Sequence, residues 1–246
     1  MNNIYTDNVY VLYQNEKEKD RFINYIKESN VNLNYQLIHS IPFEEKDNVI
    51  PSFDRKINFS NNYFELCLKN YKDYKINNNQ ISHIKSICHI LVDAINNNYD
   101  SICILEYDIL INKDFNEILP KYKNLITNCD IIYLGSSQSF WYNPINYSTI
   151  DFRENQFSPY YIANHSLGTF SIILKKNVFS LYLEYLNLFL FSSDIVLSIV
   201  SQQFKSIVIY PNLIICDITE SSILKNRDPE KTFLKFKWNK INYLGC

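Results

Sequence analysis

Two carboxylates, Glu106 and Asp108, follow a short apolar run at 101–105 that predicts a buried strand of a parallel sheet. In an extended chain, side chains two residues apart project to the same side, so the two acids could share one ligand. Mg²⁺ and Mn²⁺ prefer oxygen ligands and often hold substrate phosphates as well. The spacing therefore allows a divalent-cation site at the end of this strand. The alternative is that both acids simply end a strand and face water.

The elements that position these acids alternate between strand and helix along the sequence. We expect strands at 9–13, 33–38, 101–105, 130–134, 169–174, 206–210 and 213–216, and helices at 16–29, 80–97, 114–126 and from 175 to about 203. The clearest helix is 80–97, whose apolar residues recur every three or four positions: Ile81, Ile84, Cys88, Leu91, Val92 and Ile95. This alternation predicts an α/β fold whose mainly parallel central sheet carries helices on both faces. Ligands of such sheets bind beyond the carboxyl ends of the strands, where the two acids lie.

Composition excludes several classes of protein. The chain has 246 residues, 46% of them apolar, which predicts one globular domain over residues 1–246. A net charge of −2 predicts no general attraction to nucleic acid or to anionic membranes. The most apolar stretch, 178–200, contains Glu184, Asn187 and Asp194, so we expect no transmembrane segment.

The cysteines and the codon bias indicate a cellular setting. None of the six cysteines forms a CxxC pair, which argues against a zinc site or a redox dithiol and favours a reducing compartment. The polar first residues lack the basic region of a signal peptide. Asn, Ile, Lys, Tyr and Phe are abundant, which indicates an A/T-rich genome. We therefore expect a cytoplasmic protein of an A/T-rich microbe, or of the host cytoplasm if the source is a virus.

Further segments, together with the acidic strand end, resemble the family 25 glycosyltransferases, which include lipopolysaccharide and collagen galactosyltransferases. The family has a Ser-His pair that opens a helix and then a strand that ends in Glu-Asp-Asp; here these positions hold Ser82-His83 and Glu106-Tyr107-Asp108. Tyr107 thus replaces the central acid of the family, and Asn78-Asn79 stands where Gly-Cys is usual. The likeness spans about residues 9–223, and its other segments are Val9-Tyr10-Val11-Leu12 with Asp20-Arg21, Ile131-Ile132-Tyr133-Leu134-Gly135, Gly168-Thr169-Phe170-Ser171 with Ile172-Ile173, and Ser193-Asp194.

This resemblance implies a GT-A fold, a nucleotide-sugar donor and inversion at the anomeric carbon. It makes Asp108 the expected ligand of Mn²⁺ or Mg²⁺, and it places Glu106 either at the donor ribose or at the metal. The residues expected at the nucleotide-sugar are Val11, Arg21, Ser82, His83, Glu106 and Tyr107.

Several of these assignments have a structural alternative. Arg21 is expected at the diphosphate, or else in solvent on its helix. His83 lies off the apolar stripe and is expected to contact the donor phosphate or to bridge to the acidic site; otherwise it belongs to a hydrogen-bonded structural pair with Ser82. Tyr107 is expected to stack near the nucleobase, or else to pack as a buried structural residue.

Inverting transfer also needs a base that removes the proton of the acceptor hydroxyl. Asp194 is the main candidate because it follows Ser192-Ser193 at an expected helix start. The alternative is an acid of the first helical turn that the helix dipole favours. Glu154 and Asp217 are weaker candidates for the base.

An insertion at 136–166 is long for a compact domain, and such loops are usually functional. Its aromatic cluster includes Trp141 and Tyr142, which could form a platform for a sugar ring or, alternatively, anchor the loop by hydrophobic contacts. His165 is a further candidate for contact with the acceptor or the metal. We assign Trp141, Tyr142 and His165 to the acceptor.

The sequence thus predicts a metal-dependent inverting glycosyltransferase that moves a hexose, galactose or glucose, from a UDP-sugar to a glycan or a hydroxylated polypeptide. One alternative is a GT-A transferase with another donor, such as a nucleotide-linked N-acetylhexosamine. Another is a catalytically inactive glycan-binding relative, an interpretation that Tyr107 keeps open. A homodimer is compatible with all three, and no nucleic-acid partner is expected.

Overall fold

The computed structural model describes residues 4–44, 67, 69, 75–137, 152–153, 160–163, 166–220, 228–236 and 238–245. Within these residues, one eight-stranded sheet has the order β2-β1-β3-β8-β5-β9-β7-β6, and β4 and β10 form a second, two-stranded sheet. The strands of the large sheet are β1 (Asn8–Tyr13), β2 (Gln36–His39), β3 (Ser101–Glu106), β5 (Ile131–Tyr133), β6 (Phe152–Arg153), β7 (Tyr160–Ile162), β8 (Ser171–Lys175) and β9 (Ser206–Ile209). Those of the small sheet are β4 (Ile109–Ile111) and β10 (Ile214–Cys216).

The large sheet is mainly parallel, as expected, with two strands reversed. β1 pairs in parallel with β2 and β3, and β5 pairs in parallel with β9. β8 runs antiparallel between β3 and β5, and β7 runs antiparallel to β9 and β6. The direction of β8 is not visible in its sequence, because a strand buried on both faces is a continuous apolar run whichever way it points.

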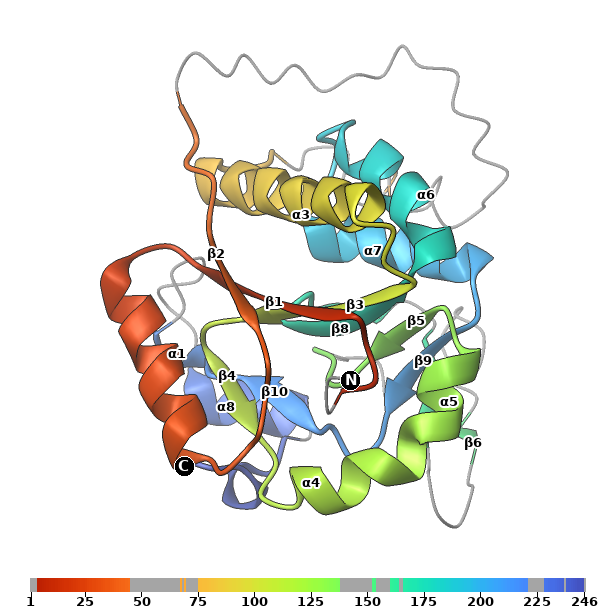
Figure 1. The fold of residues 1–246 in the computed structure, drawn as a ribbon. Helices are drawn as coiled ribbons and strands as arrows, with labels where there is room; N and C mark the ends of the chain where they lie inside the picture. The colour runs from red at the N-terminus through yellow and green to blue at the C-terminus, as the bar shows by residue number, and fades with distance from the viewer. Residues whose placement is uncertain are drawn as a thin grey trace.

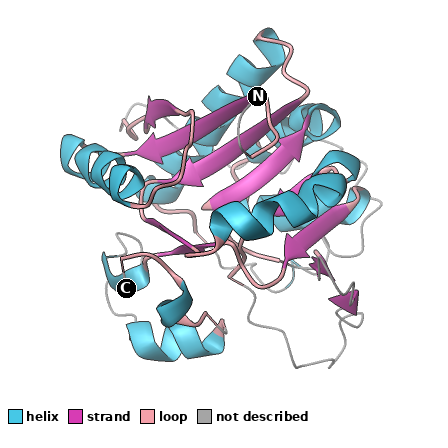
Figure 2. Ribbon diagram, turned by 60° about the horizontal axis from the view of Figure 1, so that its bottom comes forward, coloured by secondary structure: helices cyan, strands magenta, loops and turns pink. Residues whose placement is uncertain are grey.

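Helices cover both faces of this sheet (Figures 1 and 2). α3 (Asn78–Asn96), α6 (Lys176–Leu186) and α7 (Ser193–Val200) lie on one face, and α1 (Glu16–Glu28), α4 (Phe115–Ile118), α5 (Lys123–Asn128) and α8 (Pro229–Lys235) lie on the other. Each face has its own core, and alternate side chains of β1 divide between them: Val9 and Val11 on the α1 side, Tyr10 and Leu12 on the α3 side. The mixed α/β class, with helices on both faces, is consistent with the expected GT-A-like fold.

The α3 helix shows where the sequence prediction was correct and where it was wrong. Its N-terminus is fixed by a capping box, in which Asn77 and Gln80 exchange side-chain to backbone hydrogen bonds. The buried face comprises Ile81, Ile84, Ser86, Ile87, Ile90, Leu91 and Ala94. Val92 and Ile95, which we expected on that face, are 43% and 41% exposed. They lie one position past the buried Leu91 and Ala94, so they turn off the stripe that packs on the sheet.

The segment predicted as one helix at 114–126 is divided in three. α4 is followed by a 3₁₀ turn at Leu119–Tyr122 and then by α5. Pro120 stands at the start of that 3₁₀ turn, where it lacks the N–H that a continuous α-helix would use. Further 3₁₀ turns lie at Ser201–Gln203, Ile218–Glu220 and Lys240–Asn242.

No helix in the described part of the chain is both long and apolar enough to span a membrane.

Candidate functional site

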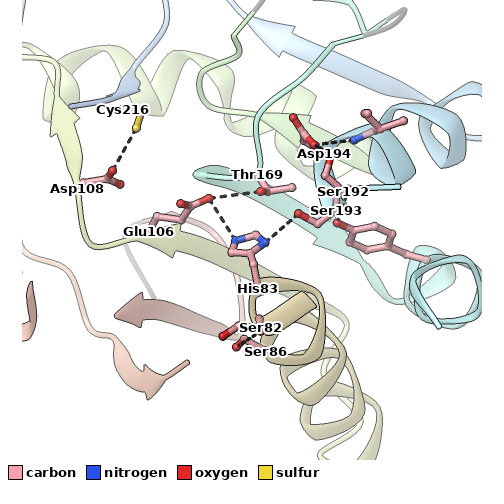
Figure 3. A network of polar contacts seen from close by, with 12 residues as sticks. Ser82, His83, Ser86, Glu106, Asp108, Thr169, Ser192, Ser193, Asp194 and Cys216 are labelled. Carbon is pink, nitrogen blue, oxygen red and sulfur yellow. Dashed lines mark hydrogen bonds and ion pairs between the residues drawn. The ribbon is translucent and has the colours of Figure 1, made fainter. Parts of the chain in front are cut away.

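Polar side chains from several elements meet at the carboxyl end of β3 (Figure 3). β3 supplies Glu106, the first turns of α3 supply His83, the segment before β8 supplies Thr169, and the start of α7 supplies Ser193 and Asp194. The parallel strands β1, β2 and β3 all end on this side of the sheet. The location is the one that the strand-end rule for α/β sheets predicts.

His83 connects the acidic strand end to α7. Its Nε2 lies 3.4 Å from Glu106 Oε1, and its Nδ1 lies 2.8 Å from Ser193 Oγ. The His83 and Glu106 side chains are only 19% and 26% exposed. Thr169 Oγ1 donates a further hydrogen bond to Glu106 Oε1, at 3.3 Å. His83 therefore bridges to the acidic site, which is one of the two contacts that the sequence led us to expect for it.

The charges of His83 and Glu106 stabilise each other. Burial disfavours the charged imidazole, but the nearby carboxylate of Glu106 outweighs it and raises the pKa of His83 above its ordinary value, with smaller contributions from Asp194 and Asp108. Burial would likewise raise the pKa of Glu106, yet His83 and the Thr169 hydroxyl hold it below its ordinary value. The negative charge of Glu106 is thus already balanced within the protein.

Asp108 stands in a different environment, because β3 ends at Glu106 and the chain turns through Tyr107 and Asp108 into β4. Our premise that an extended strand carries both acids to one side was therefore wrong. Asp108 Oδ2 accepts a hydrogen bond from Cys216 Sγ at 3.3 Å, whereas Oδ1 is buried and has no partner among the described residues. Burial and the neighbouring Glu106 raise the pKa of Asp108 to about 7.

The residues at this turn fit a hard divalent cation, provided that much of the coordination comes from outside the protein. A buried carboxylate oxygen without a partner is a suitable ligand for such an ion. The described residues contain no group of three or more His, Cys, Asp or Glu side chains that could hold a metal. Mg²⁺ is commonly held by one or two carboxylates together with substrate phosphates and water, so Asp108 alone satisfies the minimum requirement.

Arg21 lies on the Asp108 side of the site, and a carboxylate holds it there. Its Nη2 is 2.5 Å from Asp217 Oδ2, and the Asp217 N–H donates to the Asp108 carbonyl at 2.6 Å. Burial would raise the pKa of Asp217, but hydrogen bonds from Thr219 and the charge of Arg21 lower it. Asp217 is therefore an ion-paired carboxylate and a poor base, and Arg21 is not simply a solvated helix residue.

Asp194 occupies the second position of α7, close enough to contribute to the raised pKa of His83. Its Oδ1 accepts hydrogen bonds from Ser192 Oγ at 2.5 Å and from the Ile195 N–H at 2.9 Å. Asp194 thus lies in the first turn of α7, where the helix dipole favours its charge. This position is also compatible with a role as the base, which stays a prediction.

The side chains of Val11 and Ser82, both expected at the nucleotide-sugar, make contacts within the protein. The Val11 side chain is fully buried in the core on the α1 side, in the middle of β1, and the expected contact of this residue with the donor stays a prediction. Ser82 Oγ donates to the Ile41 carbonyl at 2.5 Å, and Ser86 Oγ accepts from the Ile41 N–H at 2.9 Å. These two serines fasten the segment after β2 to α3.

Tyr107 is partly buried against the α1-side core, and its N–H donates to the Leu12 carbonyl at 3.0 Å. Burial, followed by the charge of Asp108, raises the pKa of its hydroxyl. The tyrosine therefore has a structural contact, and its expected stacking on a base is still a prediction. Trp141, Tyr142, Glu154 and His165 lie outside the described residues.

Three residues of the site had no role in the sequence analysis: Thr169, Ser193 and Cys216. The first two stood within segments that carry the family likeness, but hydroxyl residues are too common for their types to signal a contact. Cys216 gave no signal, because it follows an apolar run in which a cysteine is usually a small core residue.

A comparison with protein-family models agrees with the likeness seen in the sequence. A family model described as Glycosyltransferase family 25 (LPS biosynthesis protein) matches residues 8–181, which run from β1 into α6 and include His83, Glu106 and Asp108. Among solved structures, A197 from STIV is similar with 10% identity, covering 82% of this chain and 80% of that chain, with a TM-score of 0.35. No curated protein matches. The matched region thus contains both acids of the strand end, while Asp194 lies beyond it.

Proposed function

The chain belongs to glycosyltransferase family 25 and is a glycosyltransferase, and we propose that it moves galactose or glucose from a UDP-sugar to a glycan or hydroxylated polypeptide acceptor. The observation that carries this proposal is the convergence of His83, Glu106 and Asp108 at the carboxyl end of β3, where an α/β sheet binds its ligand. The family description names lipopolysaccharide biosynthesis, which favours a glycan over a polypeptide as the acceptor.

Asp108 would hold Mn²⁺ or Mg²⁺ through its buried oxygen, and oxygens of the donor diphosphate would supply further ligands. When bound, the cation neutralises the charge that develops on the departing diphosphate. Arg21, held beside Asp108 by Asp217, adds a second positive charge on that side. Glu106 is already balanced by His83, so we assign it to a hydroxyl of the donor rather than to the metal.

The reaction is a single displacement with inversion. The acceptor hydroxyl attacks the anomeric carbon from the face opposite the diphosphate, the bond from that carbon to the diphosphate oxygen breaks, and Asp194 takes the hydroxyl proton. Asp194 is preferred as the base because Asp217 is committed to Arg21. Fixed charges on both sides of the sugar would then stabilise the transition state without a protein nucleophile.

Two alternatives follow from single features. A different nucleotide-sugar, such as an N-acetylhexosamine donor, would use the same acids. An inactive glycan-binding protein is the reading that Tyr107 favours, because it removes one acid from the strand end. We also propose a cytoplasmic location, since Cys88, Cys103, Cys129 and Cys216, in the part of the chain that the structure describes, are free thiols. A homodimer remains a prediction.

A thermal-shift screen of nucleotide-sugars with and without Mn²⁺ tests the donor. A ligand at about 100 times its Kd stabilises a protein by about 2.7 kcal/mol, so the correct donor should raise Tm by several degrees only with the metal present. Hydrolysis of that donor would exclude the inactive alternative. Equal, small shifts for every donor would contradict the assignment.

Proton NMR of the product linkage, taken early in the reaction, tests the mechanism. Inversion of an α-linked gluco- or galacto-configured donor gives a β product with a large anomeric coupling. A small coupling would mean retention, and it would overturn both the displacement and the assignment of Asp194 as base.

A further inference from the structure

The C-terminal segment 228–245 exposes large apolar side chains to solvent. Leu234 in α8 is 79% exposed, and Ile241 in the following 3₁₀ turn is 72% exposed. Val92 and Ile95, the other strongly exposed aliphatic residues in the described part of the chain, reach only 43% and 41%. These two side chains have the largest exposed fractions among the exposed large apolar residues that the structure describes.

Lysines lie near these two side chains, together with the acids Asp228 and Glu230, and Lys231 Nζ lies 3.3 Å from Asp228 Oδ2. In α8, Lys231 and Lys235 are exposed and lie three residues before and one residue after Leu234. Lys240, which precedes Ile241, places its Nζ 4.3 Å from the centroid of the Phe233 ring and so lies against α8. These five residues, Lys231, Leu234, Lys235, Lys240 and Ile241, form what we term the lysine–aliphatic surface.

This part of the sequence is basic although the whole chain is not. Residues 225–240 contain six Lys and Arg against two Asp and Glu, whereas the chain as a whole has 24 against 26. The net charge of −2 predicts no general attraction to anionic membranes, but a local cluster acts within about a Debye length, roughly 10 Å. Local charge, and not the net charge, therefore decides what this segment attracts.

The surface rests on a rigid base that reaches the candidate site. Phe233 and Phe236, on the buried side of α8, pack on Trp238 with ring centroids 5.9 and 4.9 Å away. Trp238 packs edge-on against Phe170 at 5.8 Å, and the Phe170 carbonyl accepts the Glu106 N–H at 3.0 Å. α8 lies on the same face of the sheet as α1 (Figure 1). The aromatic cluster thus joins the helix that carries Leu234 to the core beneath the candidate site.

We propose that the lysine–aliphatic surface docks on an anionic lipid bilayer. Exposed aliphatic side chains insert at the boundary between headgroups and acyl chains, and lysines beside them extend their ammonium groups to lipid phosphates. The cores of protein interfaces are depleted of lysine, so this composition fits a membrane better than a protein partner. A nucleic acid would leave Leu234 and Ile241 without a function.

Docking here has a consequence that rests on the proposed function. The aromatic cluster links the surface to Thr169 and Glu106, so a docked molecule would hold its donor site close to the lipid headgroups.

Co-sedimentation with vesicles tests the docking without any donor or acceptor. The full chain should pellet with vesicles of phosphatidylglycerol and phosphatidylcholine, remain in solution with phosphatidylcholine alone, and be released by high salt. Each lysine near such a surface contributes about fivefold to binding, so Lys231→Gln with Lys235→Gln should weaken it by about 25-fold. Leu234→Ser with Ile241→Ser should weaken binding at low salt, where the parent protein pellets with the vesicles.

Matched controls use exposed residues elsewhere. Val92→Ser with Ile95→Ser, and Lys27→Gln with Lys121→Gln, should bind vesicles like the parent. Circular dichroism verifies folding, and if the aliphatic double variant does not fold, the lysine double variant decides alone. No binding to the anionic vesicles, equal losses in the controls, or binding to soluble polyglutamate in place of vesicles would each overturn the proposal. None of these outcomes bears on sugar transfer, which is measured separately.

Discussion

Glu106 and Asp108 stand two residues apart, yet the fold gives their carboxylates opposite environments. Glu106 faces His83 and Thr169, whose charge and hydrogen bond lower its pKa. Asp108 faces the Cys216 thiol, keeps one buried oxygen without a partner among the described residues, and has a pKa raised to about 7. The first carboxylate already has a positive partner in contact, whereas among the described residues the second has only the more distant charge of Arg21, which is paired with Asp217.

The difference teaches that the number of acids in a motif does not give the number of metal ligands. A buried carboxylate that an imidazolium neutralises gains little from a cation, whereas one without such a partner gains much. We therefore expect variants at the two acids to have unlike effects.

Asp108→Ala should abolish the Mn²⁺-dependent part of UDP affinity, because it removes the carboxylate oxygen that lacks a partner. Glu106→Gln, the matched variant, should keep metal dependence and lose only a contact to the donor, about tenfold in affinity or less. Calorimetry of UDP binding with Mn²⁺ and with EDTA measures both. Equal affinity of the parent protein in the two conditions would refute the metal assignment.

Asp194→Asn should leave UDP binding unchanged and lower turnover by about 10²–10⁴-fold, the usual contribution of a general base. The amide can still accept the hydrogen bonds from Ser192 and Ile195, so α7 should keep its start. Steady-state kinetics with the identified donor provide the measurement. Near-parent turnover would move the base elsewhere, and Glu154 would be tested next, because Asp217 is paired with Arg21.

Ser193→Ala should free His83 Nδ1 and let the imidazole change its tautomer, since Ser193 Oγ is its partner at 2.8 Å. We expect turnover to fall by about tenfold, as for other groups that orient a site residue. Nitrogen-15 NMR of the histidine rings reports the tautomer directly. Ser192→Ala, which removes a bond to Asp194 and none to His83, is the control and should leave the His83 signals unchanged.

The His83–Glu106 pair should contribute about 1 kcal/mol to stability, as a partly buried ion pair, and only within a pH window. The folded pKa of His83 is raised, so its contribution is complete below about 6.5 and is lost as the pH rises through the folded value. The folded pKa of Glu106 is lowered, so its contribution is present above about 4.5 and is lost as the pH falls through the folded value.

A double-mutant cycle of His83→Gln and Glu106→Gln, by urea unfolding, measures this coupling. It should be largest near pH 6 and should vanish at high pH. A coupling that is the same at both would show that the contact is not ionic.

The sequence by itself determined the order and type of most elements, because hydrophobic periodicity and local caps act over a few residues. β1, α1 and β3 appear within one or two residues of their expected bounds, and the capping box at Asn77 and Gln80 accounts for the start of α3. The acidic strand end and the Ser-His pair were also visible, since residue types at short spacing need no knowledge of the fold.

Only the tertiary structure decided which groups share an environment. Nothing in the sequence near Asp108 indicates that Cys216 lies against it, or that Ser193 meets His83 across 110 residues. The reversed β8 and the turn at Tyr107 could not be read from local patterns, because burial on both faces erases strand direction and a two-residue turn leaves no periodicity. The charge state of a carboxylate depends on neighbours brought from distant segments, so the sequence supplied the two acids, and packing alone placed His83 against Glu106 and the Cys216 thiol against Asp108.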